Sequence, residues 1–199
     1  MKKHLLLKLS ALLALILLPA CKTTAPQGKY TVKAYKPNNP DKVVVKLSLA
    51  TQNVYVKEGD RLLMAVQGCV GTPKDPTPRG DFRITNKIKN KRRNSQPDAG
   101  YPMAYWCEFR TAYGFHEGFV HPHPRTHGCV RLHREAAARL FALVKVGTPV
   151  SIARTQPEDQ QYGHLVRKLD QSKDPDPPRS YMMSSAWFKD PAGPLLITE

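Results

Sequence analysis

The 199-residue sequence has few cysteines and few acidic residues. No two of its four Cys form a Cys-x-x-Cys pair, which argues against a disulfide-dense mini-fold and a zinc ribbon. With 16 Asp+Glu against 31 Lys+Arg, the formal net charge is +15, so we expect an anionic partner. No internal repeat is present. A hydrophobic content of 41% excludes wholesale disorder, and the length fits one catalytic domain with flanks.

The first 20 residues have the pattern of an export signal. A basic start precedes an apolar run over residues 9–18, which is too short to span a bilayer comfortably. Ala20 directly before Cys21 resembles the cleavage box of bacterial lipoproteins, which implies lipidation of Cys21 and a lipid anchor in the outer membrane. We therefore expect a signal peptide over residues 1–20 and a cell-envelope protein on the periplasmic side. An ordinary cleaved signal with a chance Cys is the alternative.

The basic residues are concentrated in the body of the chain. Residues 155–199 hold only 5 basic residues against 7 acidic ones, so the excess lies upstream. Because an exported chain does not meet nucleic acid, we expect no nucleic-acid partner. A cell-wall polymer rich in carboxylates fits both the charge and the compartment.

Composition divides the mature chain into three parts. Residues 21–42 are rich in Pro, Asn and Thr and predict a tether, whereas residues 43–154 have the apolar periodicity of a folded domain. Residues 155–199 are polar and contain several Pro, which predicts a tail of low order with an apolar end.

The folded part is predicted to be mostly β. Short β-branched runs such as residues 43–49 alternate with polar turns, which indicates antiparallel strands. One helix is predicted from Arg134, because apolar residues recur there at helical spacing until Gly147-Thr148-Pro149 ends it. A last strand over residues 150–153 closes the domain.

His116 and Cys129 are the residue types of nucleophilic acyl transfer. A free thiol has a pKa of about 8.5 and is only a few per cent ionised at neutral pH, so it needs a base that takes and returns its proton. An imidazole suits this task. Gly128 lets the chain bend so that backbone N–H donors converge on a tetrahedral intermediate. The residues alone therefore predict Cys–His acyl transfer.

The segment Thr126-His127-Gly128-Cys129-Val130-Arg131-Leu132, with His116 upstream, resembles the signature of the L,D-transpeptidase (YkuD-type) catalytic domain. Residues 45–56 resemble the opening hairpin of that family, and residues 70–82 resemble its Gly…Thr-Pro-x-Gly loop. The resemblance covers residues 43–154. It implies a YkuD-type β-sandwich-like catalytic domain with one or two short helices.

The resemblance also implies roles for the signature residues. Cys129 would be the nucleophile and His116 its base. Thr126, His127 and Gly128 would form the oxyanion and substrate-binding region, with the backbone N–H groups of Gly128 and Cys129 as donors. Arg131 would contact a substrate carboxylate or brace the loop. Glu117 stands where the family often has a small residue, so the group that orients His116 stays open.

The implied reaction is a transfer between peptidoglycan stem peptides. Cys129 attacks the carbonyl of the third residue of a tetrapeptide stem, D-alanine leaves, and an amine of another stem or of a wall-linked lipoprotein resolves the thioester. No metal and no organic cofactor is implied. With water as acceptor, the same thioester would give an L,D-carboxypeptidase or a hydrolase of wall-bound protein. A non-catalytic tether between membrane and wall is an alternative of another class.

Several His and Cys residues allow further interpretations. A zinc site with Cys129 is one, since five of the seven His lie between residues 116 and 133, but the intervening Pro restrict their convergence. We expect His121 and His123 to be exposed instead. Cys69 and Cys107 either form a disulfide in an oxidising compartment or are two buried thiols.

Two further clusters are open to interpretation. The basic run over residues 87–93 either grips an anionic polymer or is a solvated loop, and we favour the loop. Trp106 is predicted to be a core residue. The neighbouring aromatic residues Tyr101, Tyr105 and Phe109 line a substrate groove or fill the core, with Tyr105 a candidate neighbour of the oxyanion site.

Overall fold

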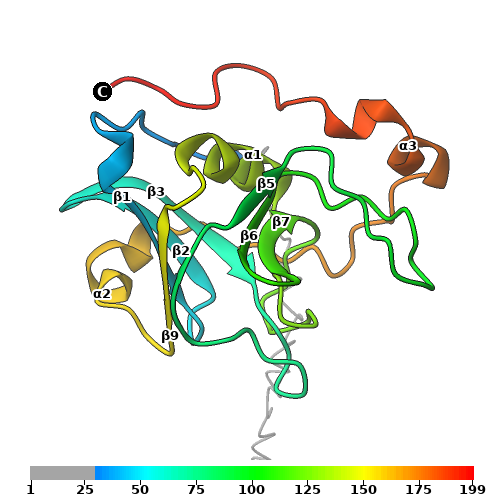
Figure 1. Cartoon of the computed structure of the whole chain (residues 1–199), viewed down its shortest axis with the longest axis horizontal. Helices are drawn as coiled ribbons and strands as arrows, with labels where there is room; N and C mark the ends of the chain where they lie inside the picture. The colour runs from blue at the N-terminus through cyan, green and yellow to red at the C-terminus, as the bar shows by residue number, and fades with distance from the viewer. Residues whose placement is uncertain (1–29) are drawn as a thin grey trace, which may run out of the picture. The chain divides into compact units, whose positions relative to one another are not determined.

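The β-branched runs form strands in the computed structural model, which describes residues 30–199. The strands of this part are β1 (Val43–Ser48), β2 (Asn53–Glu58), β3 (Arg61–Cys69), β4 (Gly80–Arg83), β5 (Asn86–Ile88), β6 (Trp106–Arg110), β7 (Tyr113–Glu117), β8 (Val130–Leu132) and β9 (Pro149–Ala153). They join in one sheet in the order β4-β9-β1-β2-β3-β8-β7-β6-β5 (Figure 1). The predictions for the signal peptide and for lipidation of Cys21 lie outside the described residues.

The sheet curls on itself. Phe82 of β4 packs against Phe109 of β6, with ring centroids 5.5 Å apart, although these strands lie near opposite ends of the strand order. The curled sheet encloses fully buried apolar side chains from most of its strands, among them Leu47, Leu63 and Phe115. The predicted mostly β class is therefore confirmed, and residues 30–199 contain three short α-helices where one or two were expected. Trp106 and Phe109 are buried, as expected of core residues.

Strand pairing differs in part from the expected antiparallel arrangement. Among the described residues, β1 pairs with β9 and β7 pairs with β8 in parallel, while the other pairings are antiparallel. Alternation shows that a segment is a strand but not which neighbour it has, because pairing depends on long-range contacts. The parallel pair of β7 and β8 is the one that matters for the site.

The predicted helix is confirmed as α1 (Arg134–Leu143). His133 caps its start, since the Glu135 N–H donates to His133 Nδ1 at 3.2 Å. The small side chains Ala136, Ala137 and Ala138 are buried, which lets the helix pack closely on the sheet. Within residues 30–199, no helix combines the length and the apolar character that a membrane span needs.

Residues 155–199 are ordered against the domain, which corrects the expected tail of low order. The segment contains the short helices α2 (Glu158–Tyr162) and α3 (Arg179–Met183) and the 3₁₀ turns η2 (Gly163–Leu165) and η3 (Ser185–Phe188). Asp159 accepts hydrogen bonds from the hydroxyl groups of Ser48, Thr51 and Tyr55. Trp187 and Phe188 are buried in the core cluster. The polar composition of this segment did not predict these contacts, because each one depends on a partner far away in the sequence.

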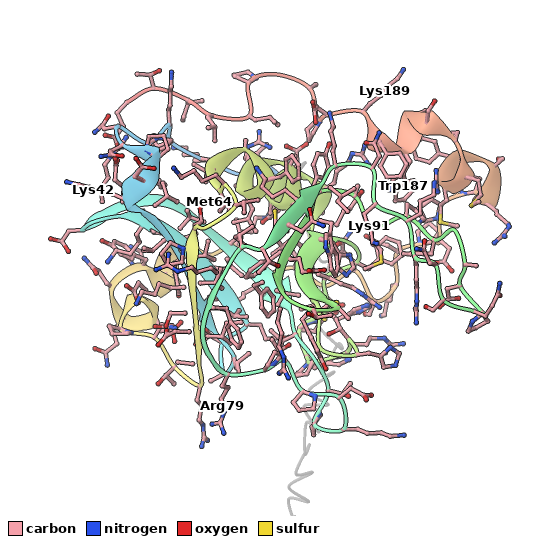
Figure 2. The ribbon with its side chains drawn as sticks, viewed as in Figure 1. Lys42, Met64, Arg79, Lys91, Trp187 and Lys189 are labelled. Carbon is pink, nitrogen blue, oxygen red and sulfur yellow. The ribbon has the colours of Figure 1, made fainter. Side chains whose placement is uncertain are left out.

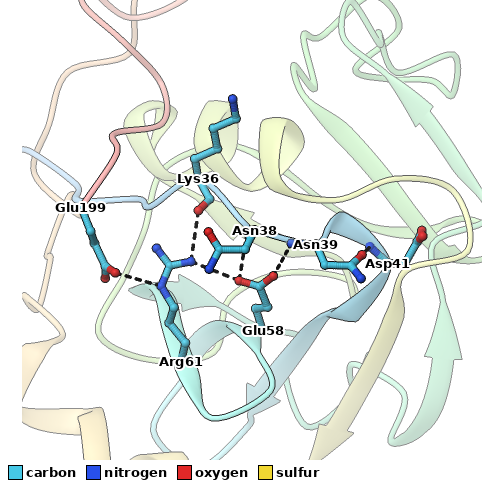
Figure 3. A network of polar contacts seen from close by, with 7 residues as sticks. All are labelled: Lys36, Asn38, Asn39, Asp41, Glu58, Arg61 and Glu199. Carbon is cyan, nitrogen blue, oxygen red and sulfur yellow. Dashed lines mark hydrogen bonds and ion pairs between the residues drawn. The ribbon is translucent and has the colours of Figure 1, made fainter.

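Hydrogen bonds from Arg61 hold both ends of the compact unit Thr31–Glu199 on the domain. Arg61 donates to the Glu199 carboxylate at 3.1 Å and to the Lys36 carbonyl at 3.1 Å, and it pairs with Glu58 (Figure 3). The Glu58 carboxylate also accepts backbone N–H groups of the segment that leads into η1 (Pro40–Lys42). The part of the predicted tether from residue 31 onward therefore packs on the domain.

Cys69 and Cys107 are two free, buried thiols, so the disulfide between them is not formed. Cys69 lies on β3 and Cys107 on β6, three positions apart in the strand order. With strands roughly 4.8 Å apart, three spacings exceed the limit of about 7 Å between the Cα atoms of a disulfide. Of the two interpretations, the buried pair of thiols is correct.

Candidate active site

Strands β7 and β8 bring His116 and Cys129 to the same face of the sheet. His116 is the register partner of Arg131 in this parallel pair. Cys129, two residues before Arg131, therefore lies beside Gly114, two residues before His116. Because side chains alternate along a strand, His116, Cys129 and Arg131 all project from one face.

The imidazole of His116 is buried and held in one orientation. Its Nδ1 lies 2.6 Å from the carbonyl oxygen of Glu117, and a carbonyl only accepts, so Nδ1 carries the proton and Nε2 keeps a lone pair. Burial lowers the pKa of His116 to about 4, with the Glu117 carbonyl opposing and the Arg131 charge adding to the decrease. The ring packs beside Trp106, with centroids 5.8 Å apart. At neutral pH, His116 is thus an uncharged base.

The thiol of Cys129 is partly exposed and lies next to β7. Its Sγ donates to the Ala112 carbonyl at 3.6 Å. Burial raises the pKa of the thiol, while a backbone hydrogen bond from Gly114 and the charges of Arg131 and Arg93 offset part of the increase. At neutral pH the resting form is therefore the thiol, and attack on a carbonyl needs a base to remove its proton.

The turn before Cys129 is fixed by its own side chains. Thr126 Oγ1 donates to the Cys129 carbonyl at 2.5 Å and accepts the Gly128 N–H at 3.1 Å. One of the two expected oxyanion donors is therefore engaged with Thr126 rather than directed at a substrate oxygen. Gly128 has a φ of 103°, and a Cβ there would lie 2.4 Å from the Tyr113 ring, so only glycine fits. His127 is exposed beside this turn.

Thr77 braces the same turn from another loop, a role that the sequence interpretation did not assign. Its buried Oγ1 donates to the Gly128 carbonyl at 2.9 Å and accepts the Gly71 N–H at 2.9 Å. The two loops touch so closely that a Cβ on Gly71 would lie 2.9 Å from Gly128 Cα. The sequence feature that could have indicated this role is the Thr-Pro-x-Gly motif, which contains Thr77.

The basic run over residues 87–93 is not a solvated loop. Lys87 Nζ donates to two carbonyls at the end of α1, at 2.6 and 2.7 Å, and burial lowers its pKa. Lys89 pairs with Asp190, and Arg92 donates to carbonyls of residues 182–184. Arg93 pairs with Asp98 and lies near enough to act on His116 and Cys129. Lys89 and Arg92 thus tie the loop to the C-terminal segment, whereas Lys87 ties strand β5 to the end of α1. The sequence did not reveal these contacts, because the partners are far apart in the chain.

Two other candidate residues, His121 and Tyr105, lie elsewhere than expected. His121 is buried, which corrects the expected exposure, whereas His123 is exposed. In the part of the chain that the structure describes, no group of three or more His, Cys, Asp or Glu is placed to hold a metal ion. Tyr105 is buried, and its hydroxyl donates to Asp190 at 3.0 Å, so it serves the C-terminal segment. Tyr101 is the exposed aromatic residue near Arg131.

Comparison with known proteins gives consistent results. Residues 40–152 match the family model of the L,D-transpeptidase catalytic domain, YkuD. A curated YkuD relative from Bacillus licheniformis is 34% identical over 122 residues, which cover 57% of this chain and 68% of that protein.

Solved structures establish the same fold. An L,D-transpeptidase from Xylanimonas cellulosilytica is 25% identical with a TM-score of 0.52, over 59% of this chain and 63% of that one. An L,D-transpeptidase from Mycobacterium smegmatis is 20% identical with a TM-score of 0.51, over 56% of this chain and 58% of that one. This chain therefore matches less than two thirds of the length of either structure.

Proposed function

Because the chain belongs to the YkuD family of L,D-transpeptidase catalytic domains, we propose that it is a cysteine-dependent peptidoglycan L,D-transpeptidase. The observation that supports this proposal is the parallel register of β7 and β8, which pairs His116 with Arg131, together with the backbone hydrogen bond from Gly114 of β7 to Cys129. The free Nε2 of His116 supports it further, since this atom is the one able to take the thiol proton.

The reaction begins with an uncharged pair. As Cys129 Sγ forms its bond to the carbonyl carbon of the third stem residue, the thiol proton moves to His116 Nε2. Collapse of the tetrahedral intermediate breaks the peptide bond, and the amine of D-alanine leaves with that proton. An acceptor amine then attacks the thioester and gives up a proton to His116, which returns it to the Cys129 sulfur. The new amide replaces the old one, so the step needs no oxidant and no external energy.

Arg131 supplies positive charge on the face where substrate binds. Its guanidinium lies close enough to lower the pKa of both His116 and Cys129. A cation in this position also attracts the carboxylates of a stem peptide and stabilises negative charge that develops on the attacked oxygen. Arg93 adds a second positive charge from the neighbouring loop.

We further propose that the mature protein works in the cell envelope. The export signal over residues 1–20 and the Ala20-Cys21 pair support a lipid anchor on the periplasmic side of the outer membrane. The excess of basic residues suits a carboxylate-rich wall polymer. Metabolic labelling with a fatty acid, beside a Cys21→Ala variant, tests the anchor. Absence of label in the parent protein would contradict it.

The activity is tested by mass spectrometry. A soluble form from residue 22 onward is incubated with a disaccharide-tetrapeptide, beside a Cys129→Ala control. Loss of D-alanine with a dimeric product, only in the protein that has Cys129, is the expected result. A tripeptide without dimer would establish hydrolysis in place of transfer. If neither the substrate nor the mass of the protein changes, both transfer and hydrolysis are contradicted. The non-catalytic tether is then the interpretation that remains.

A further inference from the structure

Glu117 directly follows the proposed base and is fixed at every polar group but one. Its backbone N–H donates to the Ala104 carbonyl at 2.9 Å, and its own carbonyl accepts His116 Nδ1–H. The side chain is buried, and Oε1 accepts Arg134 Nη1–H at 2.9 Å. Any movement of Glu117 therefore moves the acceptor that selects the tautomer of His116.

Arg134 connects Glu117 to the C-terminal segment. Its Nη2 donates to the Trp187 and Lys189 carbonyls, and its guanidinium lies 5.8 Å from the centre of a Trp187 ring. Figure 2 labels Trp187 and Lys189 on this segment and Lys91 on the loop between β5 and β6. The guanidinium of Arg134 thus joins strand β7 to a segment that lies 53 to 55 residues after Arg134 itself.

Within residues 30–199, two buried polar atoms without hydrogen-bond partners, which are unfavourable in free energy, lie next to the site. Glu117 Oε2 and Trp187 Nε1 are both buried, and neither has a hydrogen-bond partner among the described residues. Burial raises the pKa of the Glu117 carboxyl, while Arg134 and the indole of Trp187 lower it. The indole donor of Trp187 therefore lies close enough to the Glu117 carboxylate to act on its pKa. The ion pair joins buried Glu117 to a partly exposed Arg134, and a pair that takes a carboxylate out of water adds little net stability, so another role is expected for it.

We propose that Arg134 and Trp187 are positioning residues that hold Glu117 in place and, through its carbonyl, keep Nε2 of His116 directed at Cys129. This inference rests on the proposed function, in which His116 is the base. It assigns a role in catalysis to the C-terminal segment, which lies outside the residues that match the family model.

Loss of the contacts among Glu117, Arg134 and Trp187 is expected to raise the pKa of His116. The groups that face its imidazole are the Arg131 guanidinium from β8, the Arg93 guanidinium from the β5–β6 loop, the Trp106 ring from β6 and Glu117 itself. Without Arg134, Glu117 is held less firmly and water gains access to the imidazole. Burial is the largest cause of the lowered pKa of His116 and outweighs the opposing effect of the Glu117 carbonyl, so hydration of the ring raises the pKa of His116.

The test compares Arg134→Gln with Arg139→Gln in the full soluble chain. Arg139 is a matched control, since it lies on the same helix, is buried and pairs with Glu135 at 2.6 Å. Both variants lose one ion pair of α1. We expect Arg134→Gln to lower kcat about tenfold with little change in KM, as displacement of a catalytic group does. We also expect it to move the acidic limb of the pH–rate profile upward by about one unit, whereas Arg139→Gln leaves the limb in place.

Two further variants keep the test decisive if Arg134→Gln fails to fold. Glu117→Gln preserves shape and removes the charge, and Trp187→Phe preserves burial and removes the N–H. Each should lower kcat severalfold without a large change in melting temperature, and Arg134→Lys should recover the position of the acidic limb. Equal kcat and equal pH profiles for the Arg134 and Arg139 variants would overturn the inference. An inactive parent chain, or an active Cys129→Ala variant, would instead overturn the proposed function.

Discussion

Replacement of Thr77 with valine tests how much the brace behind Cys129 contributes to stability and to activity. The Thr77 hydroxyl is the shared partner of the Gly128 carbonyl and the Gly71 N–H, each at 2.9 Å. Valine keeps the shape and removes both hydrogen bonds. The carbonyl of buried Gly128 then loses its partner, at a cost of about 1–3 kcal/mol, whereas water reaches partly exposed Gly71. We expect a total loss of about 2 kcal/mol.

Urea unfolding measures this loss directly, and thermal unfolding should show a decrease in Tm of about 4–8 °C for a chain of this size. Thr77→Ser is the control, because it keeps the hydroxyl and removes one methyl group, at about 1 kcal/mol. We expect Thr77→Val to slow acylation of Cys129 by about tenfold or more, since the turn is free to shift, and Thr77→Ser to retain the rate. Equal stability of the valine variant and the parent, or a serine variant as impaired as valine, would refute this reasoning.

Three further predictions concern ionisation and thiols. The acidic limb of kcat/KM should lie near pH 4, the value to which burial lowers the pKa of His116, and a limb near the usual value of about 6.5 would show a solvated imidazole. Alkylation of the denatured, unreduced chain should modify both Cys69 and Cys107 in peptide mass maps, and a linked peptide pair would contradict the structure. Hydrogen bonds from hydroxyl groups hold the pKa of Asp159 below its usual range despite burial, so its stabilising effect is present at neutral pH and is lost as pH falls through that lowered pKa. Asp159→Asn should therefore cost about 1–2 kcal/mol in urea unfolding at pH 7 and progressively less below pH 4, and an equal cost at both pH values would contradict this linkage.

Much of the fold follows from local patterns. The alternation that begins at Val43 predicted β1, and apolar spacing after Arg134 predicted α1, because burial of one face sets the period of each element. The pairing of β7 with β8 in parallel was not predictable, since twelve residues separate these strands and several connections fit that length. The chemistry of Cys129 and His116 suggested their partnership, but the parallel register is what puts them on one face.

By itself, the sequence determined which residues carry reactive groups and indicated several of the strands and the helix α1, but not the short helices after residue 155. It determined the family as well, because the segment around Cys129 is contiguous and its motif is local. Only the tertiary structure decided the partners of single groups: Glu117 with Arg134, Thr77 with Gly128. Each such contact joins positions far apart in the chain, and its geometry depends on how the sheet curls rather than on any local preference. The same reason explains why the segment after residue 155, polar in composition, is part of the folded unit.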